Sequence, residues 1–410
     1  MHSVKAVFFA LALLASTALA LAQTPVKVQS LSTAKPAELS AYLFRPEGTG
    51  PHPAIVVAHG CGGIHARERN WARFFHERGY VVLTVDSFTG RVYGDTCTTA
   101  GLINIADRVG DVFGGLKYLH TLPEVDKRRI GLIGFSQGGD TVLKAVAQGT
   151  NNLLGDAPGF AAASSFYPSC YGQEADSTIS LLIQIGEKDD WTPAFPCQQK
   201  VAARKKEGFP VELIVYDGAH HAFDSPDSTY NYNSARRSPL KLDFCCGATA
   251  SYDIGAHNQA VKATEKFFEQ HLKTADPTAR KPWVPKPEPT LSDLAGLLKD
   301  ARAFADSNGQ EALIERITAL DPQFRKRRQY LTLLRQDGFS LAHGLFPLAL
   351  KGSMFATKSK DASTGKTLLE IIRATLDKSP PQGRFTNANG TYELVAERLG
   401  ETILVSVLTP

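Results

Sequence analysis

Short runs of apolar, often β-branched residues alternate with amphipathic stretches between residues 53 and 272. This alternation is typical of βαβ units, in which crossover helices join parallel strands. Two of the intervening stretches, residues 105–122 and 138–149, have helical periodicity. We therefore predict an α/β fold with a mostly parallel sheet and helices on both faces. The predicted buried strands are residues 54–60, 79–88, 129–136, 180–190 and 211–221.

A proline-rich stretch divides the chain. Residues 276–290 contain five prolines among polar residues, which predicts a stiff linker between a first domain at residues 23–275 and a second at 291–410. The second domain begins with helical periodicity over residues 291–320. Short apolar runs with turn signals at Asp337-Gly338 and Asn389-Gly390 follow. We predict a smaller α+β domain there.

The first 22 residues resemble a cleavable secretory signal. Lys5 precedes an apolar run that starts at Ala6, and small residues stand at Ala20 and Ala22. We expect this segment to be removed and the protein to be periplasmic or secreted. The alternative is an uncleaved anchor, which the short, alanine-rich run disfavours, and no later segment is apolar for long enough to span a bilayer. We therefore expect no stable membrane anchor.

Charge and cysteine content narrow the possible partners. Lys and Arg total 45 against 41 for Asp and Glu, and a net charge of +4 does not predict nucleic acid or an anionic membrane as a partner.

Six cysteines suit an oxidising compartment, and their spacing favours disulfides over a metal site. We expect Cys170 to pair with Cys197. Because a bond between neighbours strains the intervening peptide, we expect Cys245 or Cys246 to pair elsewhere or stay free.

The sequence GFSQGG places Ser136 between Gly134 and Gly138, after a predicted strand and before a predicted helix. This is the context of a nucleophile elbow, a tight turn that presents a serine hydroxyl. Its central residue has strained backbone angles, which explains the flanking glycines. The alternative is a serine that caps the following helix.

A serine nucleophile needs a histidine base and a carboxylate that orients the base. Asp189 and Asp190 come at the end of the next predicted strand, and His220 and His221 come at the end of the strand after that. Ser, then Asp, then His on loops after strands is the chain order of α/β-hydrolases. Taken singly, Asp190 could cap a helix and either histidine could lie on the surface.

Acyl transfer places negative charge on a carbonyl oxygen, and backbone N–H groups usually stabilise it. The sequence HGCGG follows the first predicted strand, where an oxyanion loop would lie. We assign the N–H groups of Cys61 and of Gln137, the residue after the serine, to an oxyanion hole. The alternative is an ordinary glycine-rich turn.

The motifs HGCGG, DSFTGR, GFSQGG, GEKDDWTP and YDGAHHAF, in this order and spacing, resemble the dienelactone hydrolase family of α/β-hydrolases over residues 23–272. The resemblance implies that Asp189 and His221, rather than their neighbours, act with Ser136. It also implies a compact enzyme without a large lid that acts on esters or lactones.

The sequence departs from that family at two positions. The enzymes that name the family have a cysteine where this chain has Ser136, and an acidic residue where it has Gly60. These departures put dienelactone itself in doubt as a substrate. Arg91, after another predicted strand, could bind a substrate carboxylate by a bidentate pair, and a structural ion pair is the alternative.

The second domain resembles a single Cache sensory domain over residues 291–410, in its long helix, the Asp337-Gly338 turn and the following LAH and Lys-Gly. The resemblance implies that this domain could bind a small ligand, promote dimerisation or only stabilise the chain. His343 would touch such a ligand only if the fold keeps a pocket there, and a structural histidine is the alternative.

Together these features predict an exported serine hydrolase that cleaves a small-molecule ester or lactone through Ser136, His221 and Asp189. No metal or organic cofactor is needed. One alternative is a serine peptidase of the same fold. Another is a small-molecule binding protein whose hydrolase domain is vestigial.

Overall fold

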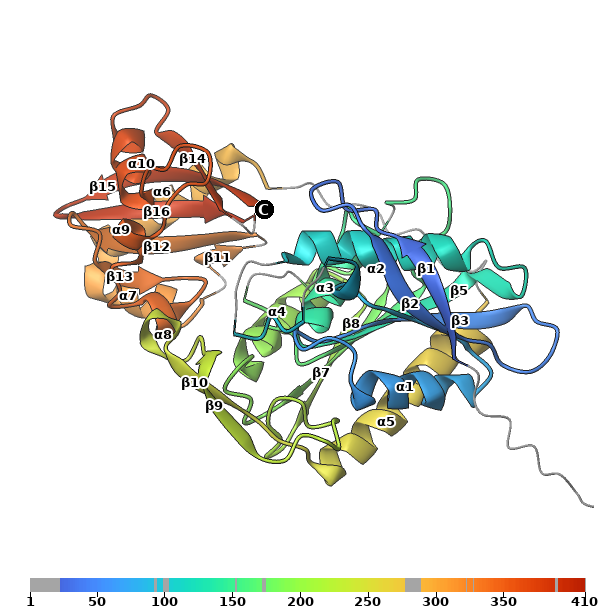
Figure 1. Cartoon of the computed structure of the whole chain (residues 1–410). Helices are drawn as coiled ribbons and strands as arrows, with labels where there is room; N and C mark the ends of the chain where they lie inside the picture. Colours follow the sequence, from blue (N-terminus) through green and yellow to red (C-terminus); the bar gives the residue numbers. More distant parts are fainter. Residues whose placement is uncertain are drawn as a thin grey trace, which may run out of the picture.

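The computed structural model describes residues 23–91, 94–98, 103–151, 153–171, 175–276, 289–321, 323–326, 328–387 and 390–409. These residues form two units, each built around its own sheet (Figure 1). The predicted signal segment, residues 1–22, lies outside the described residues, as does most of the predicted linker. No helix of the described part has the length and apolar character needed to cross a bilayer.

The first unit contains an eight-stranded sheet in the order β1-β2-β4-β3-β5-β6-β7-β8. The β1–β2 and β2–β4 pairs are antiparallel, and all pairs from β4 to β8 are parallel. The strands are β1 (Thr24–Gln29), β2 (Glu38–Phe44), β3 (His52–Ala58), β4 (Val81–Val85), β5 (Val125–Phe135), β6 (Ala162–Phe166), β7 (Ser180–Gly186) and β8 (Val211–Tyr216).

Helices cover both faces of this sheet. On one face lie α1 (Ala66–His76) and α5 (Ile254–Phe268), whose rings Phe75 and Phe268 meet with centroids 5.5 Å apart. On the other face lie α2 (Ile105–Leu119) and α3 (Gln137–Ala145) (Figure 1). The remaining helices of this unit are α4 (Ala194–Lys206), which packs against β7 and β8, η1 (Thr89–Arg91) and η3 (Glu269–Thr274).

The predicted α/β-hydrolase fold is confirmed. All five predicted strands are present, with ends shifted by a few residues, and β1, β2 and β6 are additional. Strand β6 has the sequence AASSF, which lacks the β-branched residues that mark the others, so its composition gives no strand signal. Strands β1 and β2 form the antiparallel edge of the sheet and are not part of the βαβ units on which the prediction was based.

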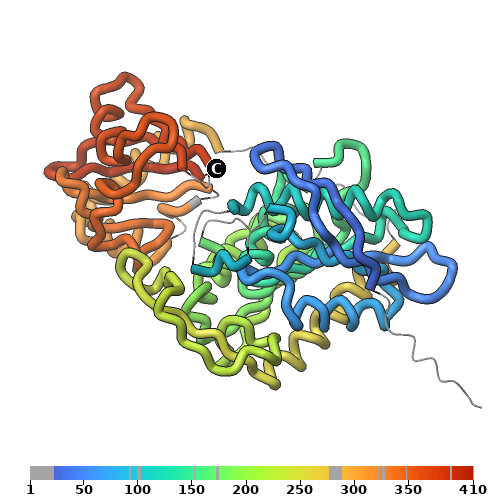
Figure 2. Tube along the Cα trace, viewed as in Figure 1, coloured from blue at the N-terminus to red at the C-terminus, as the bar shows by residue number. Residues whose placement is uncertain are grey.

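A hairpin insert lies between β8 and α5. It contains β9 (Asn231–Arg237), η2 (Leu242–Phe244) and β10 (Cys246–Ala250). Figure 2 shows this yellow-green trace leaving the first unit and reaching the second. The insert therefore links the hydrolase fold to the C-terminal unit through space as well as along the chain.

The C-terminal unit is an antiparallel sheet in the order β11-β12-β16-β15-β14, with β13 also paired to β12. Its strands are β11 (Arg325–Lys326), β12 (Gln329–Arg335), β13 (Ser340–His343), β14 (Gln382–Asn387), β15 (Gly390–Leu399) and β16 (Thr402–Leu408). Its helices are α6 (Leu291–Asn308), α7 (Gln310–Thr318), α8 (Pro347–Leu350), α9 (Phe355–Lys358) and α10 (Leu368–Leu376).

Alternation along β12 divides the apolar side chains of this unit between two cores. Leu331 and Leu333 pack with α6 and α7, whereas Leu334 packs with α10. The helix predicted over residues 291–320 is two helices, because the chain turns at Gly309 with φ of 88°. Asn389 of the second predicted turn lies outside the described residues. The resemblance to Cache domains stays a prediction.

The six cysteines form three disulfides. The predicted Cys170–Cys197 bond is confirmed, and a second bond joins Cys61 to Cys97. The expectation for the adjacent cysteines is wrong, because Cys245 bonds to Cys246. The other four cysteines pair among themselves, so each of these neighbours has only the other as a partner.

Candidate active site

Ser136 lies at a sharp turn between β5 and α3, with φ of 53° and ψ of −117°. Glycines on both sides make this turn possible. A Cβ on Gly134 would come within 2.2 Å of the Gly138 carbonyl oxygen, and one on Gly138 within 2.2 Å of the Ala58 carbonyl oxygen. Ser136 occupies the N-cap position of α3, but its side chain makes no capping hydrogen bond. The strained turn presents the hydroxyl away from the helix, as a nucleophile elbow does.

The His221 ring joins this hydroxyl to a carboxylate. Its Nε2 lies 2.9 Å from Ser136 Oγ, and its Nδ1 lies 2.8 Å from Asp189 Oδ2. Asp189 and His221 are each 2% exposed, on the loops that follow β7 and β8. The structure thus brings together the three residues predicted to act as a unit. Their hydrogen bonds run in the order that general-base activation of a serine requires.

Donors on one short turn hold the Asp189 carboxylate. Oδ1 accepts hydrogen bonds from the backbone N–H groups of Trp191 and Thr192, at 2.9 and 2.7 Å. The Thr192 hydroxyl lies 2.9 Å from Asp189 Oδ2 and 2.9 Å from His221 Nδ1. Sequence reasoning missed Thr192, although the Asp-x-x-Thr spacing is a signal for this local turn.

The neighbouring residues Asp190 and His220 have other contacts. The Asp190 carboxylate accepts hydrogen bonds from the backbone N–H and the hydroxyl of Thr249, at 2.7 and 3.1 Å, and so holds strand β10 of the insert. The His220 ring packs edge-on against Tyr230, with centroids 5.9 Å apart. The geometry therefore agrees with the choice of Asp189 and His221 that the family resemblance implied.

The predicted oxyanion residues Cys61 and Gln137 line the same cavity as Ser136. The loop that carries Cys61 is held by its disulfide to Cys97 and by the backbone N–H of Thr96, which donates to the Cys61 carbonyl at 2.9 Å. Arg108, fully buried, donates to the Gln137 side chain at 3.0 Å and to the His59 carbonyl at 2.5 Å. A buried cation thus connects both sides of the candidate oxyanion hole.

An acidic side chain does contact the oxyanion loop, although Gly60 occupies the family's acidic position. Glu68, on α1, accepts a hydrogen bond from the Gly60 N–H at 3.3 Å and forms a buried ion pair with Arg67. Burial raises the pKa of Glu68, but attraction and hydrogen bonding from Arg67 outweigh it and hold that pKa below its ordinary value. Glu68 is therefore a fixed anion, and sequence motifs give no signal for this contact.

The cavity at Ser136 has a volume of about 330 Å³. It is lined on one side by the oxyanion loop, the elbow and the Trp191–Thr192 turn. On another side it is lined by the insert, through Phe244, and by Phe346 of the C-terminal unit. Sequence reasoning made no site prediction for the insert or for Phe346, since no motif in either segment distinguishes a binding wall from a surface excursion.

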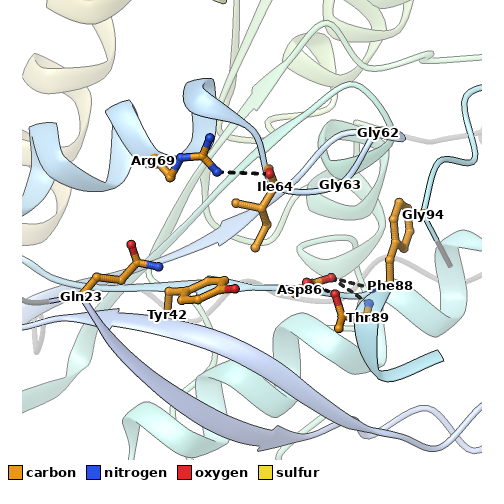
Figure 3. A pocket seen from close by; sticks show the side chains of 10 residues that line it. All are labelled: Gln23, Tyr42, Gly62, Gly63, Ile64, Arg69, Asp86, Phe88, Thr89 and Gly94. Atoms are coloured by element: carbon orange, nitrogen blue, oxygen red, sulfur yellow. Dashed lines mark hydrogen bonds between the residues drawn. The ribbon is translucent and has the colours of Figure 1, made fainter. Parts of the chain in front are cut away.

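A second cavity, of about 310 Å³, lies beside the Gly62–Gly63 turn (Figure 3). Arg69 at its rim donates to the Ile64 carbonyl at 3.4 Å. The Asp86 carboxylate accepts hydrogen bonds from the backbone N–H groups of Phe88 and Thr89. Ser136 and His221 do not line this cavity. Arg69 and Asp86 are thus engaged in local turns.

Arg91 does not reach the reaction centre. Its guanidinium forms a bidentate ion pair with Asp111, with N–O distances of 2.8 and 3.0 Å, and also donates to the carbonyl groups of Ser87 and Lys35. The Arg91 side chain is 6% exposed and the Asp111 side chain is 0% exposed. These contacts favour the structural ion pair, the alternative that the sequence left open, and substrate binding by Arg91 stays an untested prediction.

His343 is a buried residue of the C-terminal unit. Its Nδ1 accepts hydrogen bonds from the backbone N–H groups of Leu345 and Phe346, at 3.2 and 3.1 Å. Burial lowers the pKa of His343 to about 3, so the ring is neutral at physiological pH. These contacts favour the structural role over a ligand contact. Among the residues described, no group of three or more His, Cys, Asp and Glu side chains is arranged to hold a metal ion.

The model of the dienelactone hydrolase family matches residues 39–242. This range contains Ser136, Asp189 and His221 and ends within the insert. The first unit belongs to the dienelactone hydrolase family. Since a lactone is a cyclic ester, membership makes the chain a hydrolase of carboxylic esters.

Two curated relatives and one solved structure match between 45% and 61% of this chain. A probable 2-oxo-3-(5-oxofuran-2-ylidene)propanoate lactonase from a Bradyrhizobium species is 29% identical over 198 residues, 45% of this chain and 78% of that protein. A putative carboxymethylenebutenolidase from Synechocystis is 22% identical over 252 residues, 58% of this chain and 93% of that protein. The structure of a putative dienelactone hydrolase from Klebsiella pneumoniae covers 61% of this chain and 99% of its own, with 20% identity and a TM-score of 0.46.

Proposed function

We propose that this protein is an exported serine hydrolase that cleaves carboxylic esters or lactones through an acyl-enzyme on Ser136. The observation that carries the proposal is the pair of hydrogen bonds at His221, 2.9 Å to Ser136 Oγ and 2.8 Å to Asp189 Oδ2. A serine hydroxyl is a weak nucleophile at neutral pH, and this arrangement gives it a base whose orientation is fixed.

The reaction takes place in two halves. Ser136 Oγ attacks the ester carbonyl carbon while His221 Nε2 takes the hydroxyl proton, and Asp189 stabilises the imidazolium that forms. The carbonyl C–O bond to the alcohol then breaks, and His221 returns its proton to the leaving oxygen. In the second half His221 takes a proton from water and the resulting hydroxide attacks the acyl carbon. The bond from that carbon to Ser136 Oγ then breaks, His221 returns the proton to Oγ, and the carboxylic acid product leaves. In a lactone the leaving oxygen stays attached to the acyl group.

Negative charge on the carbonyl oxygen needs donors that are in place before the reaction. We assign the backbone N–H groups of Cys61 and Gln137 to this role. The Cys61–Cys97 disulfide and the Arg108 hydrogen bonds support the assignment, because both restrain the segments that carry these N–H groups. The relatives named as a lactonase and a carboxymethylenebutenolidase favour esters and lactones over peptides as the substrate class.

Export is supported by the sequence of residues 1–22 and by the cysteines. All six cysteines are joined in disulfides, a state that persists in the periplasm or outside the cell and not in a reducing cytosol. Osmotic shock separates periplasmic protein from cytosol, and secreted protein is recovered from the medium. We expect the protein in one of these two exported fractions, without residues 1–22. An intact N-terminal segment on cytosolic protein would contradict export without affecting the proposed chemistry.

Steady-state turnover of p-nitrophenyl acetate by neighbouring histidine variants tests the catalytic assignment. His221→Ala should lower kcat by a factor of about 10⁴ or more, as should Ser136→Ala, because residues of such a unit act together. His220→Ala is the matched control and should keep near wild-type turnover, since His220 contacts Tyr230 and not the serine. Wild-type turnover by Ser136→Ala would refute the proposal.

A further inference from the structure

A residue from outside the hydrolase fold lines the cavity at Ser136. Phe346, from the C-terminal unit, lines it together with Ser136, Trp191 and Phe244. Phe346 immediately precedes α8, which lies beside η2 of the insert (Figure 1). The reaction centre of the first unit therefore has an aromatic wall that the second unit provides.

The Phe346 ring is held in place by contacts with both units. Its centroid lies 4.9 Å from that of Tyr171 and 5.0 Å from that of Phe244, both in the hydrolase unit. From its own unit, His343 Nδ1 accepts the Phe346 N–H and fixes the backbone there. This acceptor requires an unprotonated Nδ1, which the buried His343 ring provides. Phe346 is thus positioned by packing and hydrogen bonding.

Several polar contacts seat the two units against each other around this wall. Asp243 of η2 accepts from Lys358 Nζ at 2.9 Å and also from the Ser353 hydroxyl. Gln199 of α4 donates to the Ala319 carbonyl at 3.1 Å. These contacts connect the insert and α4 to separate parts of the C-terminal unit, so the wall belongs to a docked interface with more than one point of attachment.

We infer that Phe346 and Phe244 form a subsite for a bulky apolar group, above all an aromatic ring, on the ester that Ser136 attacks. The inference rests on the proposed function and adds a substrate class to it. An acetyl group would leave most of a cavity of about 330 Å³ empty. Aromatic walls beside a few polar groups are typical of sites that bury the apolar body of a small molecule. The C-terminal unit thereby takes part in substrate selection.

The test compares three esters on the full-length protein by pH-stat titration: ethyl acetate, ethyl phenylacetate and benzyl acetate. The last two carry the aromatic ring on the acyl and on the alcohol side. For Phe346→Ala, kcat/KM for at least one aromatic ester should fall about tenfold, mainly through KM, because less apolar surface of the ring is buried. Ethyl acetate should change less than about twofold, since it leaves the subsite empty.

Phe304→Ala is the matched control, because Phe304 lies on α6, packs against Phe324 and does not line the cavity. It should leave the ratio of aromatic to ethyl ester at the wild-type value. Phe346→Leu, which keeps an apolar side chain, should lose less of the preference than Phe346→Ala. It also serves as the readout if Phe346→Ala fails to fold.

The outcomes separate the two proposals. An unchanged ratio in both Phe346 variants, or an equal loss on all three esters from folded protein, would overturn the subsite while leaving the hydrolase intact. Failure of the wild-type protein to hydrolyse any of the three esters by a Ser136-dependent route would instead count against the proposed function.

Discussion

At the scale of single residues, Thr192 is the part of the reaction centre that has no place in the three-residue pattern. Its hydroxyl lies within 3.0 Å of Asp189 Oδ2, His221 Nδ1 and the Tyr167 carbonyl oxygen. A hydroxyl so placed fixes the carboxylate and the ring relative to each other and to strand β6, which ends at the residue before Tyr167. Thr192 is a positioning residue, since it acts through Asp189 and His221.

Thr192→Val keeps the side-chain volume and removes the hydroxyl. We expect kcat for p-nitrophenyl acetate to fall about tenfold, the equivalent of one hydrogen bond, with KM unchanged. Thr192→Ser should restore most of kcat, because it returns the hydroxyl. A variant whose KM rises while its kcat is unchanged would show that Thr192 binds substrate rather than orienting the base.

The Arg91–Asp111 pair gives a second prediction at this scale. Removing one partner of a buried pair leaves the other charge uncompensated, so Arg91→Met should lower the free energy of unfolding by about 3 kcal/mol in urea titrations. The KM for methyl hydrogen succinate, relative to methyl butyrate, should not change. A selective rise in the KM of the succinate ester would mean that Arg91 binds substrate carboxylates after all.

Among the structural elements, the oxyanion loop is joined to a second segment by a disulfide, Cys61–Cys97. Cys61 and Cys97 both line the cavity, whereas Cys170 and Cys197 are fully buried and do not line it. The two disulfides thus allow a matched comparison between a bond whose cysteines line the cavity and one whose cysteines do not.

Cys97→Ser should lower kcat for p-nitrophenyl acetate several-fold with little change in KM, because a looser loop aims the Cys61 N–H less well at the transition state. The double variant Cys170→Ser/Cys197→Ser should lose about 2–5 kcal/mol of stability and keep its kcat below the melting transition. Equal kcat in the wild type and Cys97→Ser would show that the loop needs no such restraint.

How far the sequence predicts these elements depends on whether their signals are local. The strands that end in the elbow and in the Asp and His loops were predictable, because β-branched runs and turn residues adjoin along the chain. Strand β6 was not, since AASSF has no such composition. Glu68, Arg108 and Phe346 reach the reaction centre only through tertiary contacts, so no spacing along the chain marks them.

At the scale of the whole molecule, one buried histidine in each unit makes stability depend on pH. Burial is the largest cause that lowers the pKa values of His59 and His343, each to about 3. An unfolded histidine titrates near 6.5, so below that pH the unfolded chain binds protons that the folded chain does not. The contribution of these two neutral rings to the free energy of unfolding is therefore fully present above about pH 6.5. It is lost progressively as the pH falls toward 3.

His343→Asn keeps an acceptor for the two backbone N–H groups and removes the titration. Between pH 6 and 5, its free energy of unfolding in urea should change less steeply than that of the wild type, by up to about 1.4 kcal/mol per pH unit. An unchanged slope in His343→Asn would contradict the neutral state assigned to the buried ring.

The central claim, an activated hydroxyl at Ser136, is tested most directly by a fluorophosphonate probe followed by peptide mass mapping. Such a probe reacts covalently with a serine that a neighbouring histidine deprotonates. We expect one label, on the peptide that contains Ser136, and none in His221→Ala protein. Labelling at another serine, or no labelling of folded, oxidised protein, would contradict it.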